Sequence, residues 1–234
     1  MAAPPPSLIL TASLAGACSF AVAGMLSKQS LRLAVSAAIA AYTVDVAHFA
    51  RVFAVDVESA LARRSGLRPV REPDVMRFRC WPALVDRNAH MNNAKHLRLF
   101  NYARRSFWQR NGGWQYVLGH SPRANLVVSA STIRYRKEIR LLDPVDVRTS
   151  LVTWQDKSLL VEHRVLRPSD QFVLAICYVK YRLICEASLS AASFLAAVDA
   201  TVDASEPPPP TPADLAAWLE YDNLSSAALR PKNV

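Results

Sequence analysis

An acid, an amide and a histidine stand at alternate positions in one short polar stretch of the chain. Asp86, Asn88 and His90 lie within the sequence Asp-Arg-Asn-Ala-His-Met-Asn-Asn, which ends at residue 93. A carboxylate can act as a base or orient a histidine, an amide can hold a water or a carbonyl, and histidine titrates near neutral pH. These side chains could therefore deliver water to a carbonyl group. Polar stretches of this kind also cap helices and close turns, so a purely structural role stays open.

A helix is expected directly after this stretch. Residues 94–110 carry apolar side chains at helical spacing and are followed by two glycines, and Asn92 or Asn93 is a suitable N-cap. The first turn of a helix exposes free backbone N–H groups at the positive end of the helix dipole. We expect the N–H groups of Asn92, Asn93 and Ala94 to stabilise an oxyanion. His96, in the same turn, is expected to be exposed.

The rest of the folded region is predicted to form an antiparallel sheet. One strand is expected before the helix and four after it, at residues 75–84, 126–137, 145–153, 158–166 and 172–183. Short turns separate the last three strands, as hairpins require. One helix cannot cover its own apolar face, so the economical fold is α+β, a curved antiparallel sheet wrapped around one long central helix.

Basic residues outnumber acidic ones, and unevenly. The net charge is +9, and acidic residues predominate after residue 185, so the preceding part carries a larger basic surplus. A surplus of this kind attracts polyanions such as anionic lipids, phosphate-bearing ligands or nucleic acid. No RNP-like aromatic motif or zinc-finger spacing accompanies it, which argues against nucleic acid as a partner.

The cysteines and histidines do not predict a metal site. The four cysteines are scattered, which disfavours a disulfide framework and favours a reducing compartment. His48, His120 and His163 have no companions at ligand spacing. We therefore predict neither a metal nor a cofactor.

The N-terminal part reads as a targeting or membrane-anchoring region. Leu8–Leu26 carries no charge and approaches the length that spans a bilayer, and a second apolar run follows at Leu33–Val44. Arginines after these runs place the globular domain in the cytosol by the positive-inside rule. We expect a membrane-anchored protein, at the endoplasmic reticulum or alternatively in the mitochondrion, since the segment also resembles a transit peptide. The second run could instead be a helix packed on the domain.

The C-terminal part begins with a linker. The proline run at residues 207–210 predicts polyproline II, and Pro212 is expected to open a short helix over Ala213–Leu229. The predicted regions are therefore an anchor at 1–69, a folded domain at 70–186, and a linker with a helix at 187–234.

The polar stretch and the helix after it resemble the central motif of hotdog-fold acyl thioesterases. Asp86, Asn88 and His90 match the spacing in plant acyl-ACP thioesterases, and Tyr135–Glu138 is similar to a Tyr-Arg-Arg-Glu segment of those enzymes. An Arg-Leu-Leu-acid-Pro turn at Arg140–Pro144 and the tail at Pro212–Tyr221 are similar to the family of thioesterase superfamily member six. That resemblance runs from about residue 42 to residue 230.

The resemblance implies a homodimer that hydrolyses fatty acyl thioesters, with acyl-CoA as the substrate expected on a cytosolic face. Asp86 would be the base or orient His90, Asn88 would fix a water or the carbonyl, and Glu138 would supply a second carboxylate. Arg136 and Lys137 could steer coenzyme A phosphates, although a solvated basic face is the plainer alternative. Two rival functions stay open, an inactive acyl- or lipid-binding module and a membrane scaffold.

Overall fold

The computed structural model describes residues 27–185 and 189–229. The chain divides into two compact units, Met1–Arg51 and Val52–Val234. Helix α2 (Lys28–Val44) contains the second predicted apolar run, and α3 (Val46–Arg63) follows it. Within the described residues, no helix has both the length and the apolar character that a membrane span needs. The predicted span at Leu8–Leu26 lies outside the described residues.

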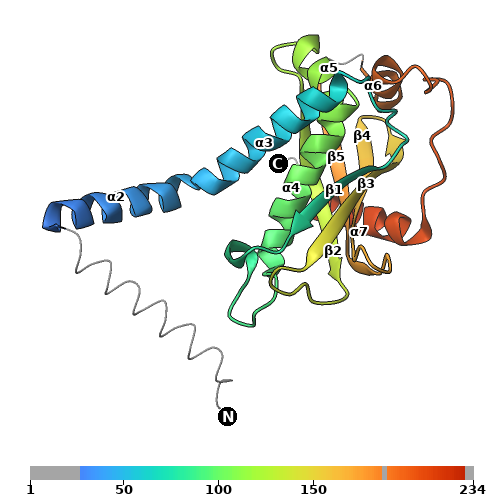
Figure 1. Cartoon of the computed structure of the whole chain (residues 1–234). Coiled ribbons are helices and arrows are strands. Elements are labelled where there is room, and N and C mark those ends of the chain that lie inside the picture. The colour runs from blue at the N-terminus through green and yellow to red at the C-terminus, as the bar shows by residue number, and fades with distance from the viewer. Residues whose placement is uncertain (1–26, 186–188, 230–234) are drawn as a thin grey trace. The chain divides into compact units, whose positions relative to one another are not determined.

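The second unit is built on one antiparallel sheet of five strands in the order β1-β3-β4-β5-β2 (Figure 1). Its strands are β1 (Asp74–Arg79), β2 (Asn125–Tyr135), β3 (Pro144–Gln155), β4 (Ser158–Leu166) and β5 (Val173–Ile184). The four strands expected after the helix are all present. The strand expected at 75–84 ends earlier, at Arg79, because Pro82 begins the short 3-10 helix η1 (Pro82–Leu84) and has no backbone N–H for a sheet.

The central helix α4 (Asn93–Arg110) lies across one face of this sheet, as Figure 1 shows. Its buried face carries Leu99, Phe100, Ala103 and Phe107. Strand residues that alternate along β4 and β5 meet this face in one core, among them Leu159, Val161, Val165, Cys177 and Val179. The domain is therefore the hotdog-like α+β fold that the periodicity and the resemblance predicted.

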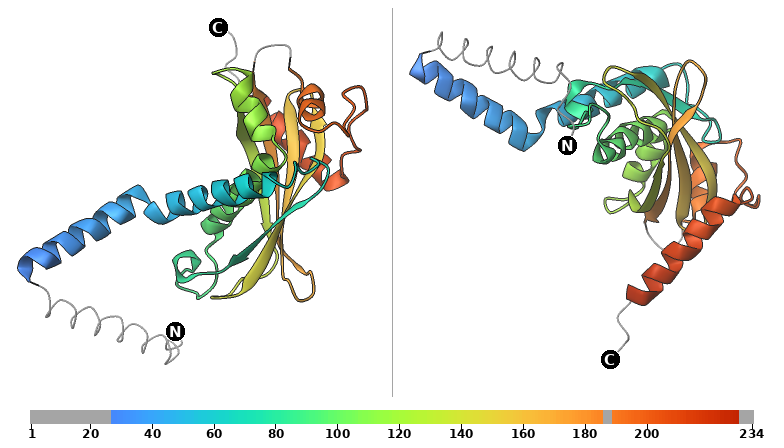
Figure 2. Two further views of the ribbon diagram at one scale, coloured as in Figure 1. Left: turned by 45° about the horizontal axis from the view of Figure 1, so that its top comes forward. Right: turned by 90° about the horizontal axis from the view of Figure 1, so that it is seen from below.

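The tail helix α7 (Ala213–Leu229) covers the opposite face of the sheet (Figure 2). Leu215 and Leu219 pack there against Leu160 and Tyr178 in a second apolar cluster. The hydroxyl of Tyr178 donates a hydrogen bond to Asp214 Oδ2 at 2.9 Å. The tail therefore covers part of the sheet face opposite to α4.

Two short helices and helix α3 contribute further residues to the core. Helices α5 (Gly113–His120) and α6 (Ala191–Val198) were not expected from the sequence, and Phe194 of α6 packs on Trp108 with ring centroids 5.9 Å apart. Val55 of α3 is also fully buried in the core cluster of this unit. A run as short and uniformly apolar as α6 has no amphipathic period from which a helix could be predicted.

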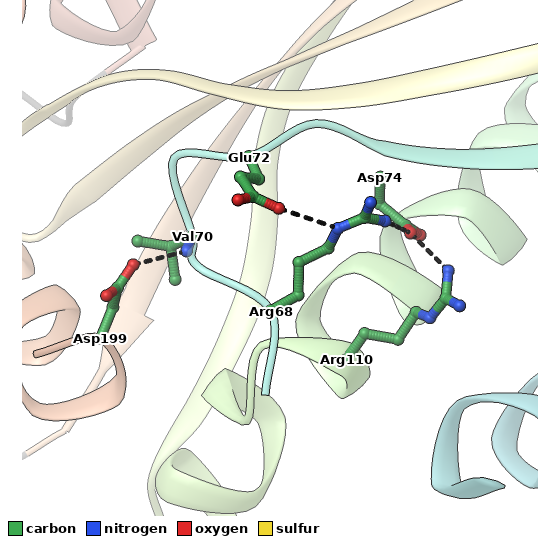
Figure 3. Close-up of polar contacts among 6 residues, drawn as sticks. All are labelled: Arg68, Val70, Glu72, Asp74, Arg110 and Asp199. Atoms are coloured by element: carbon green, nitrogen blue, oxygen red, sulfur yellow. Dashed lines mark hydrogen bonds and ion pairs between the residues drawn. The ribbon is translucent and has the colours of Figure 1, made fainter. Parts of the chain in front are cut away.

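Strand β1 is held to the end of α4 by one buried carboxylate. Asp74 is 1% exposed, and its Oδ1 accepts hydrogen bonds from Arg68 at 3.0 Å and from Arg110 at 2.7 Å (Figure 3). In the same segment the backbone N–H of Val70 donates to Asp199 Oδ2 at 2.7 Å. These bonds fix the connection between α3 and β1 against the helix and the segment after α6.

Candidate active site

The polar stretch forms a closed loop in front of α4. The N–H of Asp86 donates to the carbonyl of His90 at 3.0 Å, and the N–H of Asn88 donates to Asp86 Oδ1 at 2.8 Å. Ala89 has a φ of 60°, in the left-handed region that costs a residue with a Cβ roughly 1–2 kcal/mol. The tight turn therefore brings residues 86 and 90 to the same side of the loop.

His90 and Asp86 lie close to each other in the loop. The Nδ1 atom of His90 lies 3.7 Å from Asp86 Oδ1, and the two side chains are 32% and 22% exposed. This distance is too long for a hydrogen bond, and it makes an ion pair only when the imidazole is protonated. The Nε2 side of the imidazole is left for a substrate or a water. Asn88 is exposed, and its side chain lies outside this pair.

The segment that carries Glu138 pairs with the same loop through backbone hydrogen bonds. The N–H of Met91 donates to the carbonyl of Ile139 at 2.7 Å, and His90 pairs with Arg140 as an isolated antiparallel bridge. Glu138 Oε1 accepts two hydrogen bonds from Arg140, at 2.8 and 2.6 Å. Arg140 is the main reason that the pKa of Glu138 lies below its ordinary value, and the nearby His90 adds to the effect. Glu138 is thus a paired carboxylate beside His90.

Sequence reasoning did not assign Arg140 a role at the site. Residues two apart in an extended segment share a face, so the spacing of Glu138 and Arg140 already allowed the pair. From sequence alone, however, this ion pair could not be distinguished from the other possible pairs between Glu138 and its basic neighbours. The bridge to residue 90, which only the fold supplies, makes it part of the site.

The start of α4 offers fewer free donors than expected. Asn92 is the N-cap, and its Oδ1 accepts a hydrogen bond from the N–H of Ala94 at 2.9 Å. The N–H of Asn92 itself donates to the carbonyl of Leu84 at 2.9 Å. Of the three predicted oxyanion donors, only the N–H of Asn93 has no acceptor among the residues that the structure describes. An oxyanion role stays a prediction, and it now centres on Asn93.

The first turn of α4 is held in place by the end of β2. The hydroxyl of Tyr135 donates to the carbonyl of Asn93 at 3.0 Å, and its ring stacks edge-on against His96 at 4.9 Å. His96 is only 4% exposed, so the expectation of an exposed histidine was wrong. Burial lowers the pKa of His96, although hydrogen bonding to the helix start opposes this. A neutral imidazole and Tyr135 therefore position the helix end.

A cavity of about 720 Å³ adjoins Glu138. Lys137, Arg140 and Arg167 contribute positive charge to its lining, and Asp143 contributes a further carboxylate. Of the two cations predicted to steer phosphates, Lys137 lines this cavity. Arg136 instead lies over the ring of Phe172, with its Cζ 5.0 Å from the ring centroid.

The described residues contain no group of three or more His, Cys, Asp or Glu that could hold a metal ion. His163 is a core residue, fully buried under α4. Its Nδ1 lies 2.9 Å from Thr149 Oγ1, and its ring stacks on Phe100 with centroids 5.1 Å apart. Its role is in packing.

Comparison with known proteins gives a consistent answer. The family model of the thioesterase-like superfamily matches residues 80–219. Protein THEM6 of Danio rerio is 32% identical over 193 residues, which cover 82% of this chain and 90% of that protein. Protein THEM6 of Drosophila melanogaster is 31% identical over 141 residues, which cover 60% and 68%. Among solved structures, the probable thioesterase YbaW from Escherichia coli has a TM-score of 0.46 at 20% identity, covering 53% of this chain and 94% of that one.

Proposed function

The chain belongs to the thioesterase-like superfamily, and we propose that it hydrolyses fatty acyl-CoA thioesters at the loop of residues 86–93. One observation supports the proposal. Asp86 and His90 lie side by side in the loop before α4, and the bridge from His90 to Arg140 brings Glu138, which lines a cavity with basic side chains, near them. Water activation, oxyanion stabilisation and phosphate binding are the three tasks that acyl-CoA hydrolysis requires, and each has a candidate group here.

In the proposed reaction His90 takes a proton from water, and the water oxygen attacks the thioester carbonyl. Asp86 lies on the Nδ1 side of the imidazole and draws closer when the imidazole becomes charged, so that Nε2 acts as the base. The N–H of Asn93, at the positive end of α4, donates to the oxyanion. The carbon–sulfur bond then breaks, and the imidazolium returns its proton to the coenzyme A thiolate. The fatty acid leaves as the carboxylic acid, which gives its remaining proton to solvent.

Glu138 has a supporting role in this scheme. Its carboxylate is engaged by Arg140 and lies near His90, so it stabilises the imidazolium that forms during the reaction. Lys137 and Arg167, which line the adjoining cavity, bind the coenzyme A phosphates. The substrate then lies with its phosphates beside Glu138 and its carbonyl at the start of α4.

The test is turnover of acyl-CoA by the full chain in detergent micelles. Release of free thiol is followed across a series of acyl chains from short to long. His90→Ala and Asp86→Asn are each expected to lower the rate by about 10²–10⁴-fold, as the loss of a positioned acid–base group does. His120→Ala, at an exposed histidine of α5, is the matched control and should keep full activity. Binding of acyl-CoA without turnover would contradict hydrolysis and support the function of an acyl-binding module.

A homodimer is part of the proposal. β2 is an edge strand of the sheet, and an edge strand presents unpaired backbone groups to which a second copy can add. Light scattering on the purified chain should give twice the monomer mass. A monomer over the whole micromolar range would contradict a dimer.

Membrane attachment through residues 8–26 is proposed as well, with the second unit facing the cytosol at the endoplasmic reticulum. The uncharged composition of that segment supports it. The native protein should resist alkaline carbonate extraction and remain accessible to protease on intact microsomes. Release of the protein by carbonate would contradict the membrane anchor. Recovery of the protein in the mitochondrial fraction would contradict the endoplasmic reticulum as its location.

A further inference from the structure

A second cavity lies along the later turns of α4. It has a volume of about 300 Å³ and is bounded by Asn101, Arg104 and Trp108 of α4, by the beginning of β2, and by Tyr181 of β5. Asn101 stands eight residues after Asn93, which at the rise of an α-helix is about 12 Å from the proposed oxyanion donor. The cavity is therefore separate from the loop of residues 86–93.

The cavity contains an arginine that no other side chain neutralises. Arg104 forms no hydrogen bond or ion pair within residues 27–185 and 189–229, and no acidic residue lines the cavity. Its neighbour Arg105 shows the contrast, because its guanidinium forms a two-pronged pair with Asp56, with Nη2 2.7 Å from Oδ2. The positive charge of Arg104 is thus available to a ligand.

Two buried donors line the same cavity. Trp108 and Tyr181 are each 2% exposed, and neither the indole N–H nor the phenol hydroxyl has a hydrogen-bond partner among the described residues. Burial raises the pKa of Tyr181, so its hydroxyl keeps its proton at neutral pH. A buried donor without an acceptor is unfavourable, and a ligand with acceptor oxygens would relieve both.

Apolar walls suit the rest of the ligand, and Asn101, Arg105 and Asn125 also line the cavity. Trp114, Leu126 and Val128 form these walls. The volume is at the lower end of the range for small-molecule sites. Donors without acceptors call for an anion, and an arginine fork matches the two oxygens of a carboxylate.

We propose that this cavity binds a small amphipathic carboxylic acid, independently of catalysis at residues 86–93. The carboxylate lies on Arg104 and accepts hydrogen bonds from Tyr181 and Trp108, and the hydrocarbon part lies against Trp114 and Leu126. A free fatty acid and the free carboxyl end of a dicarboxylic acyl group share this chemistry.

The test is calorimetric titration of the full chain with hexanoate, with 1-hexanol, inorganic phosphate and the monothioester of adipic acid with coenzyme A in parallel arms. Hexanoate should bind, whereas hexanol and phosphate should bind at least tenfold more weakly, because one lacks the charge and the other the apolar part. In the His90→Ala background, which prevents hydrolysis, weaker thioester binding on adding Arg104→Met would identify the dicarboxylic source. Thioester binding that Arg104→Met leaves unchanged would identify the free acid. Absence of hexanoate binding, or equal binding of hexanol or phosphate, would overturn the proposal.

Two variants separate ligand binding from folding. Arg104→Met should weaken hexanoate binding at least tenfold, whereas Arg134→Met, at an exposed arginine of β2, should leave it unchanged. Tyr181→Phe should weaken binding several-fold and yet leave the melting temperature unchanged or higher, because it removes a buried hydroxyl without a partner. Equal hexanoate affinity in Arg104→Met and the natural chain would refute the assignment of the carboxylate to Arg104. Hexanoate affinity and melting temperature do not depend on thioesterase activity, so this test can fail independently of the proposed function.

Discussion

The fully buried His163 makes the stability of the domain depend on pH. Burial under α4, together with the charge of Arg104, lowers the pKa of His163 to about 3. In the unfolded chain a histidine has a pKa of about 6.5. Since the folded pKa is the lower one, the unfolded chain binds more protons between these values. The stabilisation is therefore complete above about pH 6.5 and is lost as the pH falls towards 3.

The size of the effect follows from the two pKa values. At pH 5.5 the unfolded state gains about 1.4 kcal/mol from protonation of His163, and the folded state gains almost nothing. Urea denaturation of the natural chain at pH 7.5 and pH 5.5 measures the total change. The same pair of measurements on His163→Phe, which keeps a ring against Phe100, should show a change smaller by about 1.4 kcal/mol.

Other groups also titrate in this range, so the comparison is made between variants. His96 has a lowered pKa too, but its contribution is common to both proteins and cancels. An equal pH dependence in His163→Phe and the natural chain would refute the argument, because it would mean that His163 is protonated in the folded state. If His163→Phe fails to fold, His163→Gln serves the same comparison.

Three further changes test the packing that positions the site, each by urea denaturation at pH 7.5. Asn92→Ala removes the N-cap of α4 and should lower the free energy of unfolding by about 1 kcal/mol. Asn88→Ala, with an exposed side chain, should change this free energy by less than about 0.5 kcal/mol. Equal losses in the two variants would mean that the cap is not formed. Leu215→Ala should lower the free energy of unfolding by about 2–5 kcal/mol, because the side chain is fully buried between α7 and the sheet. Leu224→Ala, at an exposed leucine of α7, is the control. An equally small loss in both variants would show that α7 does not pack on the sheet. Asp74→Ala leaves two arginines without their shared carboxylate and should lower the free energy of unfolding by about 2 kcal/mol, and an unchanged value would mean that the pairing is replaced by solvent.

The regular elements near the site could be predicted because their signals are local. Apolar spacing and a capping asparagine predicted a helix over 94–110, and α4 runs from Asn93 to Arg110. The proline before Ala213 predicted the tail helix, which the structure has as Ala213–Leu229. Alternation of apolar and polar residues located the four strands after α4 in the same way.

The partners of individual side chains could not be predicted in this way. His96 was expected at the surface because its position on α4 was known but the position of Tyr135 above it was not. The N–H of Ala94 was expected to be free because the side chain of Asn92 was not placed. Each outcome depends on a rotamer or on a strand distant in sequence, and neither is encoded in local spacing.

The sequence by itself determined the α+β fold class and the helix that follows the candidate site, and it predicted three polar site residues before that helix. It did so because periodicity, capping and the spacing of Asp86, Asn88 and His90 are properties of neighbouring residues. Glu138 was expected from the resemblance, but only the tertiary structure decided that Arg140 pairs with it beside His90, and that Arg104, Trp108 and Tyr181 share a cavity. Those groups come from different elements, and the packing of the sheet against α4 alone sets the distances between them.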